Sequence, residues 1–242
     1  TGYTMTFLDL HTFDRWGQSS TTGIFEKDGR KFVFVPGDTV TLGWEQFAVG
    51  LNQESREELE YLFREWEMEP QNPEEMIRES MAPVRQAVIG PMLVGRELEE
   101  LCWEPVKMDD PRLTAHPDWL KEFRDFAWSD SSSLTLHQSA RIERTEDGFQ
   151  TWIYHCTDYD ALLAGLEKQG LSLPTADEWA YLCGGGCRTL FPWGDGLDYS
   201  MRLRWFEDMD EDENRPYDME EPNFFGLSIA YDPYMRCLLY TS

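Results

Sequence analysis

Cys183 and Cys187 are the residues of this chain whose type and spacing come nearest to a reactive site. They form a C-x-x-x-C pair around three glycines, which could hold a soft metal ion or close a disulfide. A zinc or copper(I) site would need two more donors, and His155 with Cys156 is the only other neighbouring Cys/His pair in the sequence. Because a buried cysteine behaves mostly as a small apolar side chain, we expect a structural thiol pair, with a disulfide and a metal site as alternatives.

An acidic run over residues 205–221 offers oxygen ligands for a hard cation. Its carboxylates alternate like the first four ligands of a calcium loop. The match ends there, because Glu213 stands where such a loop has glycine and Met219 where it has a bidentate glutamate. A solvated acidic loop is therefore the favoured interpretation, and calcium is the candidate cofactor. The candidate ligands of this loop are Asp208, Asp210, Asp212 and Asn214, and the candidates for a differently built calcium site are Asn223 and Asp232.

The overall charge restricts the partners of the chain. It has 46 acidic and 21 basic residues, a net charge of −25. Such a balance argues against nucleic acid and against an anionic membrane surface, and it suits a cationic protein or peptide ligand or plain surface solvation. We find no run of 18 apolar residues and no basic, then apolar, opening segment, so we expect neither a membrane span nor a signal peptide. Five scattered cysteines indicate the cytoplasm.

The segment that carries the cysteine pair has clear local structure signals. Thr175 and Glu178 form a capping box after a proline, so we expect a helix that begins at Thr175 and stops at the three glycines. Beyond it, Phe191 and Trp193 flank a rigid proline before Gly194, which permits a chain reversal. We expect the helix to pack Trp179 against Trp193 and against a strand over residues 32–35.

Four motifs follow one another between residues 173 and 227, and they resemble a known family. They are LPTADEW, a glycine turn in CGGGC, PWGD and PNFFGL. In this order they resemble the formylglycine-generating enzymes, or sulfatase-modifying factors. The resemblance implies a loop-rich α+β variant of the C-type-lectin fold. We expect a single domain over residues 1–242, with helical insertions near 51–82 and 108–133. The expected structural residues are Trp179, Pro192, Trp193, Gly194, Asn223 and Gly226.

The resemblance does not extend to the family's catalytic end. Members that oxidise a target cysteine hold copper with two cysteines near the C-terminus, whereas only Cys237 lies in that region here. The three-histidine iron site of related sulfoxide synthases sits on a helical domain that this chain lacks. Two functions remain. We expect a non-catalytic binding or recognition module for a protein or peptide. The alternative is a copper- or iron-dependent oxidase of a cysteine-containing peptide or thiol, and copper is a cofactor only in that case.

The remaining elements follow from periodicity. Residues 32–35 and 39–42 predict two strands joined as a hairpin by Pro36-Gly37-Asp38. Ser55 and Glu58 predict a capping box for an acidic helix. Its apolar stripe, which we expect to be a packing surface, is Leu59, Leu62, Phe63 and Trp66.

Further along the chain, helices are expected after Asn72 and from Pro117, and a third over residues 157–168. Strands are expected over residues 84–94 and, around the Glu146-Asp147-Gly148 turn, over residues 134–156.

Overall fold

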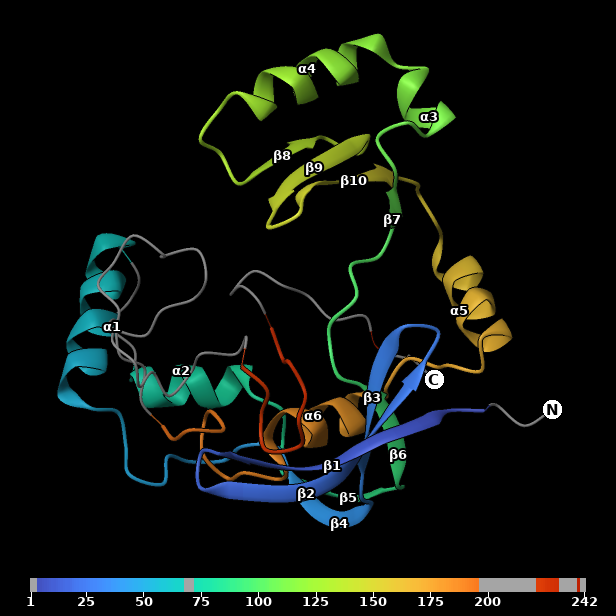
Figure 1. Cartoon of the computed structure of the whole chain (residues 1–242). Helices are drawn as coiled ribbons and strands as arrows, with labels where there is room; N and C mark the ends of the chain where they lie inside the picture. Colours follow the sequence, from blue (N-terminus) through green and yellow to red (C-terminus); the bar gives the residue numbers. More distant parts are fainter. Residues whose placement is uncertain (1–3, 68–71, 196–220, 231–238, 240–242) are drawn as a thin grey trace. The chain divides into compact units, whose positions relative to one another are not determined.

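The computed structural model describes residues 4–67, 72–195, 221–230 and 239 (Figure 1). Helices are mixed with antiparallel strands, so the α+β class is confirmed. The chain forms two compact units, one of Thr1–Leu98 with Ser172–Ser242 and one of Glu99–Leu171. Each unit has its own apolar core, whereas length and composition predict a single core for the chain. The insertion expected near 108–133 belongs to the second unit.

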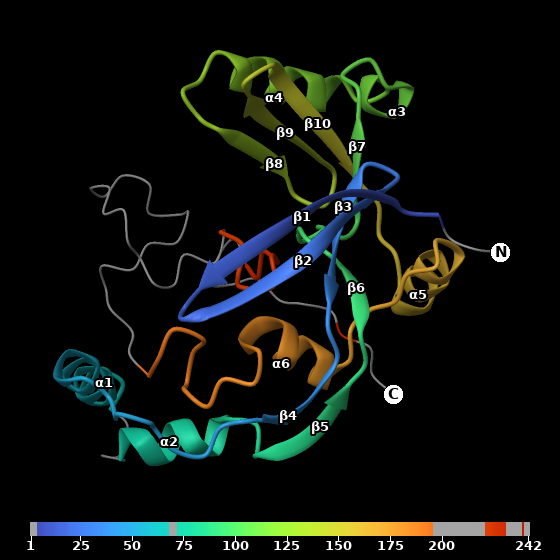
Figure 2. The same cartoon turned by 60° about the horizontal axis from the view of Figure 1, so that its bottom comes forward.

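The described residues of the first unit form two antiparallel sheets (Figure 2). The larger has the strand order β1-β2-β3-β6 and the smaller pairs β4 with β5. The bounds are Thr6–Arg15 for β1, Gln18–Lys27 for β2, Arg30–Val35 for β3, Asp38–Leu42 for β4, Arg85–Ile89 for β5 and Met92–Gly95 for β6. A two-residue turn at Trp16 and Gly17, both with positive φ, joins β1 to β2 as a tight hairpin.

The hairpin expected over residues 32–42 is wrong, although both strands exist. Strand β3 pairs with β2 and β6, and β4 pairs with β5, so the chain changes sheets at Pro36 and Gly37. At Gly37 the backbone comes so close to the Ile89 carbonyl that an added Cβ would lie 2.5 Å from its oxygen. The proline-glycine pair therefore marks a crossing between sheets, not a turn within one.

Three helices are described in the first unit: α1 (Gln53–Glu65), α2 (Pro73–Ser80) and α6 (Ala176–Gly184). Helix α1 begins at Asn52, whose side chain accepts a hydrogen bond from the Ser55 N–H, so the capping box predicted at Ser55 is wrong. Of its apolar stripe only Phe63 is buried, and Trp66 is 65% exposed. The capping box of α6 is confirmed, since Thr175 and Glu178 exchange both hydrogen bonds.

The core of the first unit lies between its sheets and α6. Helix α6 packs against β4 and β5 and contributes Tyr181 and Leu182 to the core. The other buried members of this cluster are Phe13, Val33, Val35, Val40, Leu42, Ala87, Ile89, Phe224, Phe225 and Leu227. Segments far apart in sequence are thus held by one apolar cluster.

The second unit has one antiparallel sheet of order β7-β10-β9-β8. Its strands are β7 (Trp103–Val106), β8 (Ser133–Leu136), β9 (Ala140–Thr145) and β10 (Gly148–Tyr154). Its helices are α3 (Pro111–Thr114), α4 (Pro117–Ala127) and α5 (Tyr159–Lys168). Phe123 and Phe126 of α4 pack with Ile142 and Ala140 on one face of the sheet. None of the helices within the described ranges is long and apolar enough to cross a membrane.

Candidate functional site

The family-like motifs meet in the first unit at the end of helix α6. Gly185 there has φ +60°, and a Cβ on it would lie 2.6 Å from the Phe224 ring. The chain needs glycine at this position for two reasons, the left-handed conformation and the close approach of Phe224. The glycine turn and the PNFFGL segment are therefore packed together.

Asn223 connects these two segments and is fully buried. Its side-chain nitrogen donates to the Leu182 carbonyl at 2.7 Å, and its oxygen accepts from the N–H groups of Phe225 and Leu227. All of these bonds hold main chain in place, so the structure gives Asn223 a structural position. Its oxygen, a candidate calcium ligand from the sequence, already accepts two hydrogen bonds.

The PWGD motif forms a loop tied down by Asp195, which is 6% exposed. One carboxylate oxygen accepts from the N–H groups of Ala48 and Val49, and the other accepts from the N–H of Leu190. Trp193 is half-buried and stacks on Phe191, with ring centroids 4.9 Å apart.

Two further residues that are predicted to be structural lie in this loop and in the PNFFGL segment. Gly194 has φ +142° and pairs with Phe191 across the turn. Gly226 has φ +84°, and a Cβ on it would lie 2.4 Å from the Phe13 ring. Trp193 also contacts Trp16, with ring centroids 5.6 Å apart. Helix α6 enters the core through Tyr181 and Leu182, whereas Trp179 is half-buried.

The thiols of Cys183 and Cys187 flank the end of α6 and are half-buried. The Cys187 sulfur lies 2.7 Å from where a Cβ on Gly184 would be, so it fills the space beside that glycine. Burial raises the pKa of the Cys187 thiol, outweighing the hydrogen bond from Thr189. A raised pKa keeps the thiol protonated and weakens it as a nucleophile or metal ligand.

Most calcium candidates lie outside the described residues. They are Asp208, Asp210, Asp212, Asn214 and Asp232, and Cys237 lies outside them as well. Within the described part of the chain, no three His, Cys, Asp or Glu side chains gather where they could hold a metal ion.

The second unit contains a cluster that the sequence did not predict. Trp152 is paired with Arg141 across β9 and β10, and Tyr154 is paired with Trp103 across β10 and β7. Because strand neighbours and residues two apart share a face, all four side chains point to the same side of the sheet. The opposite side carries Ile142, which packs against α4. We call Trp103, Arg141, Trp152 and Tyr154 the aromatic face.

Arg141 lies at the centre of the aromatic face. Its guanidinium carbon is 4.5 Å from the Trp152 ring centroid and 5.0 Å from that of Trp103. One terminal nitrogen donates to Glu100, and the Nε lies 3.3 Å from Glu143 without forming a well-aligned hydrogen bond. The Arg141 side chain is only 14% exposed, so the contacts fix it against both indoles.

Tyr154 completes the face, since its ring meets that of Trp103 edge to face at 5.2 Å. Desolvation raises the pKa of the Tyr154 phenol, and neighbouring Cys102 and Cys156 raise it further. The phenol therefore remains a hydrogen-bond donor at neutral pH.

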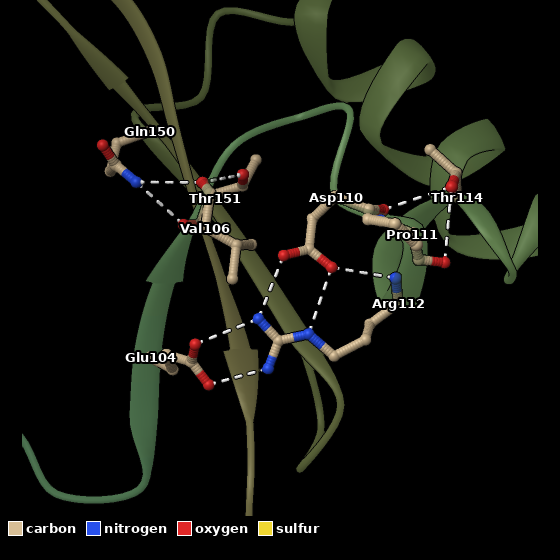
Figure 3. Close-up of polar contacts among 8 residues, drawn as sticks. All are labelled: Glu104, Val106, Asp110, Pro111, Arg112, Thr114, Gln150 and Thr151. Carbon is tan, nitrogen blue, oxygen red and sulfur yellow. Dashed lines mark hydrogen bonds and ion pairs between the residues drawn. The ribbon is translucent and has the colours of Figure 1, made fainter.

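Polar contacts hold the β7 edge of this sheet (Figure 3). Arg112 donates to both carboxylate oxygens of Glu104 and also contacts Asp110. These hydrogen bonds lower the pKa of Glu104 and of Asp110. On the neighbouring strand, Thr151 donates to the Val106 carbonyl at 2.8 Å, and so does Gln150 at 3.3 Å. These hydrogen bonds together hold β7 against β10 and α3.

An open depression of about 400 Å³ lies along the same edge. It is lined by Pro105, Val106, Lys107, Met108, Phe149 and Gln150. Pro105 and Gln150 point to the same side as Trp152, by the pairing of β7 with β10. The depression is therefore next to the aromatic face, and it could seat one side chain of a ligand.

The sequence did contain a signal for this face. Trp152 and Tyr154 stand at alternating positions of β10, separated by Ile153, whose side chain packs with the core. Two aromatic residues on the side away from the apolar core are unusual for a sheet with one solvated face. The sequence alone does not place Arg141 and Trp103 on this face, because their positions depend on the register of the strands.

No family model, no curated protein and no solved structure matches this chain.

Proposed function

We propose that this chain is a divergent relative of the formylglycine-generating enzymes that acts as a non-catalytic recognition module for a protein or peptide. The family assignment, with its C-type-lectin-like fold, rests on the four motifs. It is supported by the way the described parts of these motifs contact one another around Gly185, Asn223 and Phe224. The recognition site that we assign is the aromatic face of the second unit.

The observation that carries this proposal is the position of Arg141 between Trp103 and Trp152. Tryptophan, tyrosine and arginine are the residues that most often dominate binding energy at protein interfaces. The stack is already ordered, so a ligand that packs on it loses little side-chain entropy from this surface. The apolar core of the unit is on the other side of the sheet, so these aromatic residues are not needed to cover α4.

The charges around the aromatic face favour a cationic ligand. Glu100 and Glu143 both contact Arg141, which gives the three side chains one net negative charge. The whole chain carries −25, which attracts basic partners and repels nucleic acid and anionic membranes. We place the protein in the cytoplasm, a proposal that the thiols of Cys102, Cys156 and Cys187 support, since none of them forms a disulfide.

The proposal is tested by selecting peptides that bind. A displayed library of random 12-residue peptides is enriched on the immobilised full chain, and the selected peptides are resynthesised and titrated calorimetrically. We expect the selected peptides to be rich in Lys and Arg and to compete with one another for a single site. A library that yields no saturable binder, or one whose binders ignore substitutions of the aromatic face, would refute the assignment.

The oxidase alternative has a separate readout. Full chain is incubated with copper(I), oxygen and a Cys-x-Pro-x-Arg peptide, and the peptide is analysed by mass spectrometry. We expect the peptide thiol to remain, because the Cys187 thiol has a raised pKa and the cysteines of the glycine turn pack beside the end of α6. Conversion to formylglycine that is lost in Cys187→Ala would move the active site to the glycine turn.

A further inference from the structure

Strand β1 is a long edge strand. It has ten residues, Thr6–Arg15, and it is the outermost member of the sheet β1-β2-β3-β6 (Figure 2). Among the described residues no strand pairs with its outer side. An edge strand of this length is a template for pairing with another strand, and proteins usually protect such edges.

The alternation of hydrogen bonds between β1 and β2 shows which main-chain groups of β1 point outward. Arg15 and Gln18 flank the two-residue turn and form a hydrogen-bonded pair, so Phe13, His11 and Asp9 bond to β2 in the same way. The N–H and C=O groups of the residues between them therefore point outward. These residues are Leu10, Thr12 and Asp14. The Asp9 carboxylate already accepts the Leu10 N–H at 2.7 Å.

Apolar side chains continue up to this edge on one face of the sheet. Phe7 is 54% exposed, Leu10 64%, Phe34 43% and Leu93 44%. The pairs Phe7 with Phe25, Leu10 with Gly23, Phe25 with Phe32 and Phe34 with Leu93 place them on the same side. Exposed apolar side chains that gather on one face mark an interaction surface.

The strand sequence is complementary to itself. If two copies of β1 run antiparallel with Thr12 opposite Thr12, then Asp9 of one lies opposite Arg15 of the partner subunit, and the twofold axis repeats this pair. Phe13 then lies opposite His11 of the partner subunit, and Leu10 opposite Asp14 of the partner subunit. Registers centred on Leu10 or His11 lose the Asp9 to Arg15 match. Opposite charges across strands stabilise a pairing, and they select a register.

We propose that β1 pairs with β1 of a second copy of this chain, antiparallel and centred on Thr12. The two four-stranded sheets then form one continuous sheet, and their exposed apolar faces become adjacent. Because each copy carries a net charge of −25, the copies repel one another at long range, and salt screens this repulsion. Dimerisation therefore strengthens as sodium chloride rises from about 0.05 to 0.3 M, where the screening length falls below about 10 Å.

The register is tested by cysteine crosslinking on the full chain. Residues in a hydrogen-bonded antiparallel pair have Cα atoms about 5.5 Å apart, which is within the range for a disulfide. With oxidised glutathione, two thiols of Thr12→Cys form one disulfide, and two glutathione molecules carry away the electrons and protons. Thr21→Cys is the matched control, because Thr21 is exposed, lies one strand inward and hydrogen-bonds Thr12. Wild type under the same conditions corrects for the native cysteines.

We expect a covalent dimer from Thr12→Cys and at most a few per cent from Thr21→Cys. We also expect sedimentation to show a dimer that Asp9→Arg weakens at least tenfold and that the double variant Asp9→Arg with Arg15→Asp restores. A chain that sediments as a monomer across this salt range would overturn the proposal. So would equal crosslinking of the two cysteine variants, or a dimer that the charge reversal leaves unchanged.

Discussion

The side-chain nitrogen of Asn223 donates a 2.7 Å hydrogen bond to the carbonyl of Leu182, a residue 41 positions earlier in the chain. The same side chain accepts from two N–H groups of the turn that follows it. One buried amide therefore fixes both the end of α6 and the PNFFGL turn. Substitution of Asn223 should therefore lower the stability of the first unit as a whole.

Asn223→Ala leaves three buried main-chain groups without a partner, and each such loss costs about 1–3 kcal/mol. We expect the free energy of unfolding to fall by about 3 kcal/mol or more in urea titrations followed by tryptophan fluorescence. Asn52→Ala is the matched control, because Asn52 caps α1 at the surface and should cost about 1 kcal/mol. Equal losses in the two variants would contradict the linking role of Asn223.

Two glycines should respond in opposite directions to replacement by alanine. At Gly185 the positive φ and the Phe224 ring leave no room for a Cβ, so Gly185→Ala should destabilise by about 2 kcal/mol or more. Gly165 lies inside α5 with open space around it, so Gly165→Ala should stabilise by about 0.5–1 kcal/mol. Thermal unfolding of the two variants gives the sign of each stability change. A stabilised Gly185→Ala would refute the packing around α6.

The Glu104 carboxylate should stabilise the fold only at pH values above the acidic range. Its hydrogen bonds from Arg112 lower its pKa in the folded state, so the contribution is full above the unfolded pKa and is lost as pH falls. We expect Glu104→Gln to lower the melting temperature at pH 7, and the difference from wild type to shrink between about pH 5 and 3. Glu146→Gln, at an exposed turn, is the matched control. A constant difference at all pH values would contradict the ion pair.

Calcium provides a test of the acidic run. If Asp208, Asp210 and Asp212 hold the ion, calcium at a hundred times its dissociation constant should stabilise the fold by about 2.7 kcal/mol. The measurement is the melting temperature with millimolar calcium against the same concentration of magnesium. An Asp210→Asn chain should lose the shift. No shift in wild type would remove calcium as a cofactor.

Local signals predicted much of this fold, because they depend on neighbouring residues only. Thr175 and Glu178 are three apart and close the capping box of α6, and Asn72 before Pro73 begins α2. The predicted strand pairing failed where the choice depended on distant partners. Residues 32–35 and 39–42 look like a hairpin, but β3 pairs between β2 and β6, and β6 lies some 60 residues away in the sequence.

The candidate site was predicted still less well, for the same reason. The motif residues Asn223 and Gly226 are expected to be structural; Asn223 donates to the Leu182 carbonyl, and Gly226 lies against the Phe13 ring. The aromatic face was missed, because Trp103, Arg141 and Trp152 belong to three strands and are brought together only by the register of β7, β10 and β9. The second core was missed too, since nothing in the composition of residues 99–171 separates them from the rest of the chain.

The recognition proposal is tested most directly by the affinity of one selected cationic peptide for two tryptophan variants. Trp152→Ala removes one wall of the Arg141 stack, whereas Trp128→Ala removes a tryptophan of the same unit that is 89% exposed at the end of α4. Both variants should keep the far-ultraviolet circular dichroism of the wild type. We expect the dissociation constant to rise at least tenfold for Trp152→Ala, as for an interface residue that dominates binding, and to stay within twofold for Trp128→Ala. Equal affinity of wild type and a folded Trp152→Ala would contradict the account.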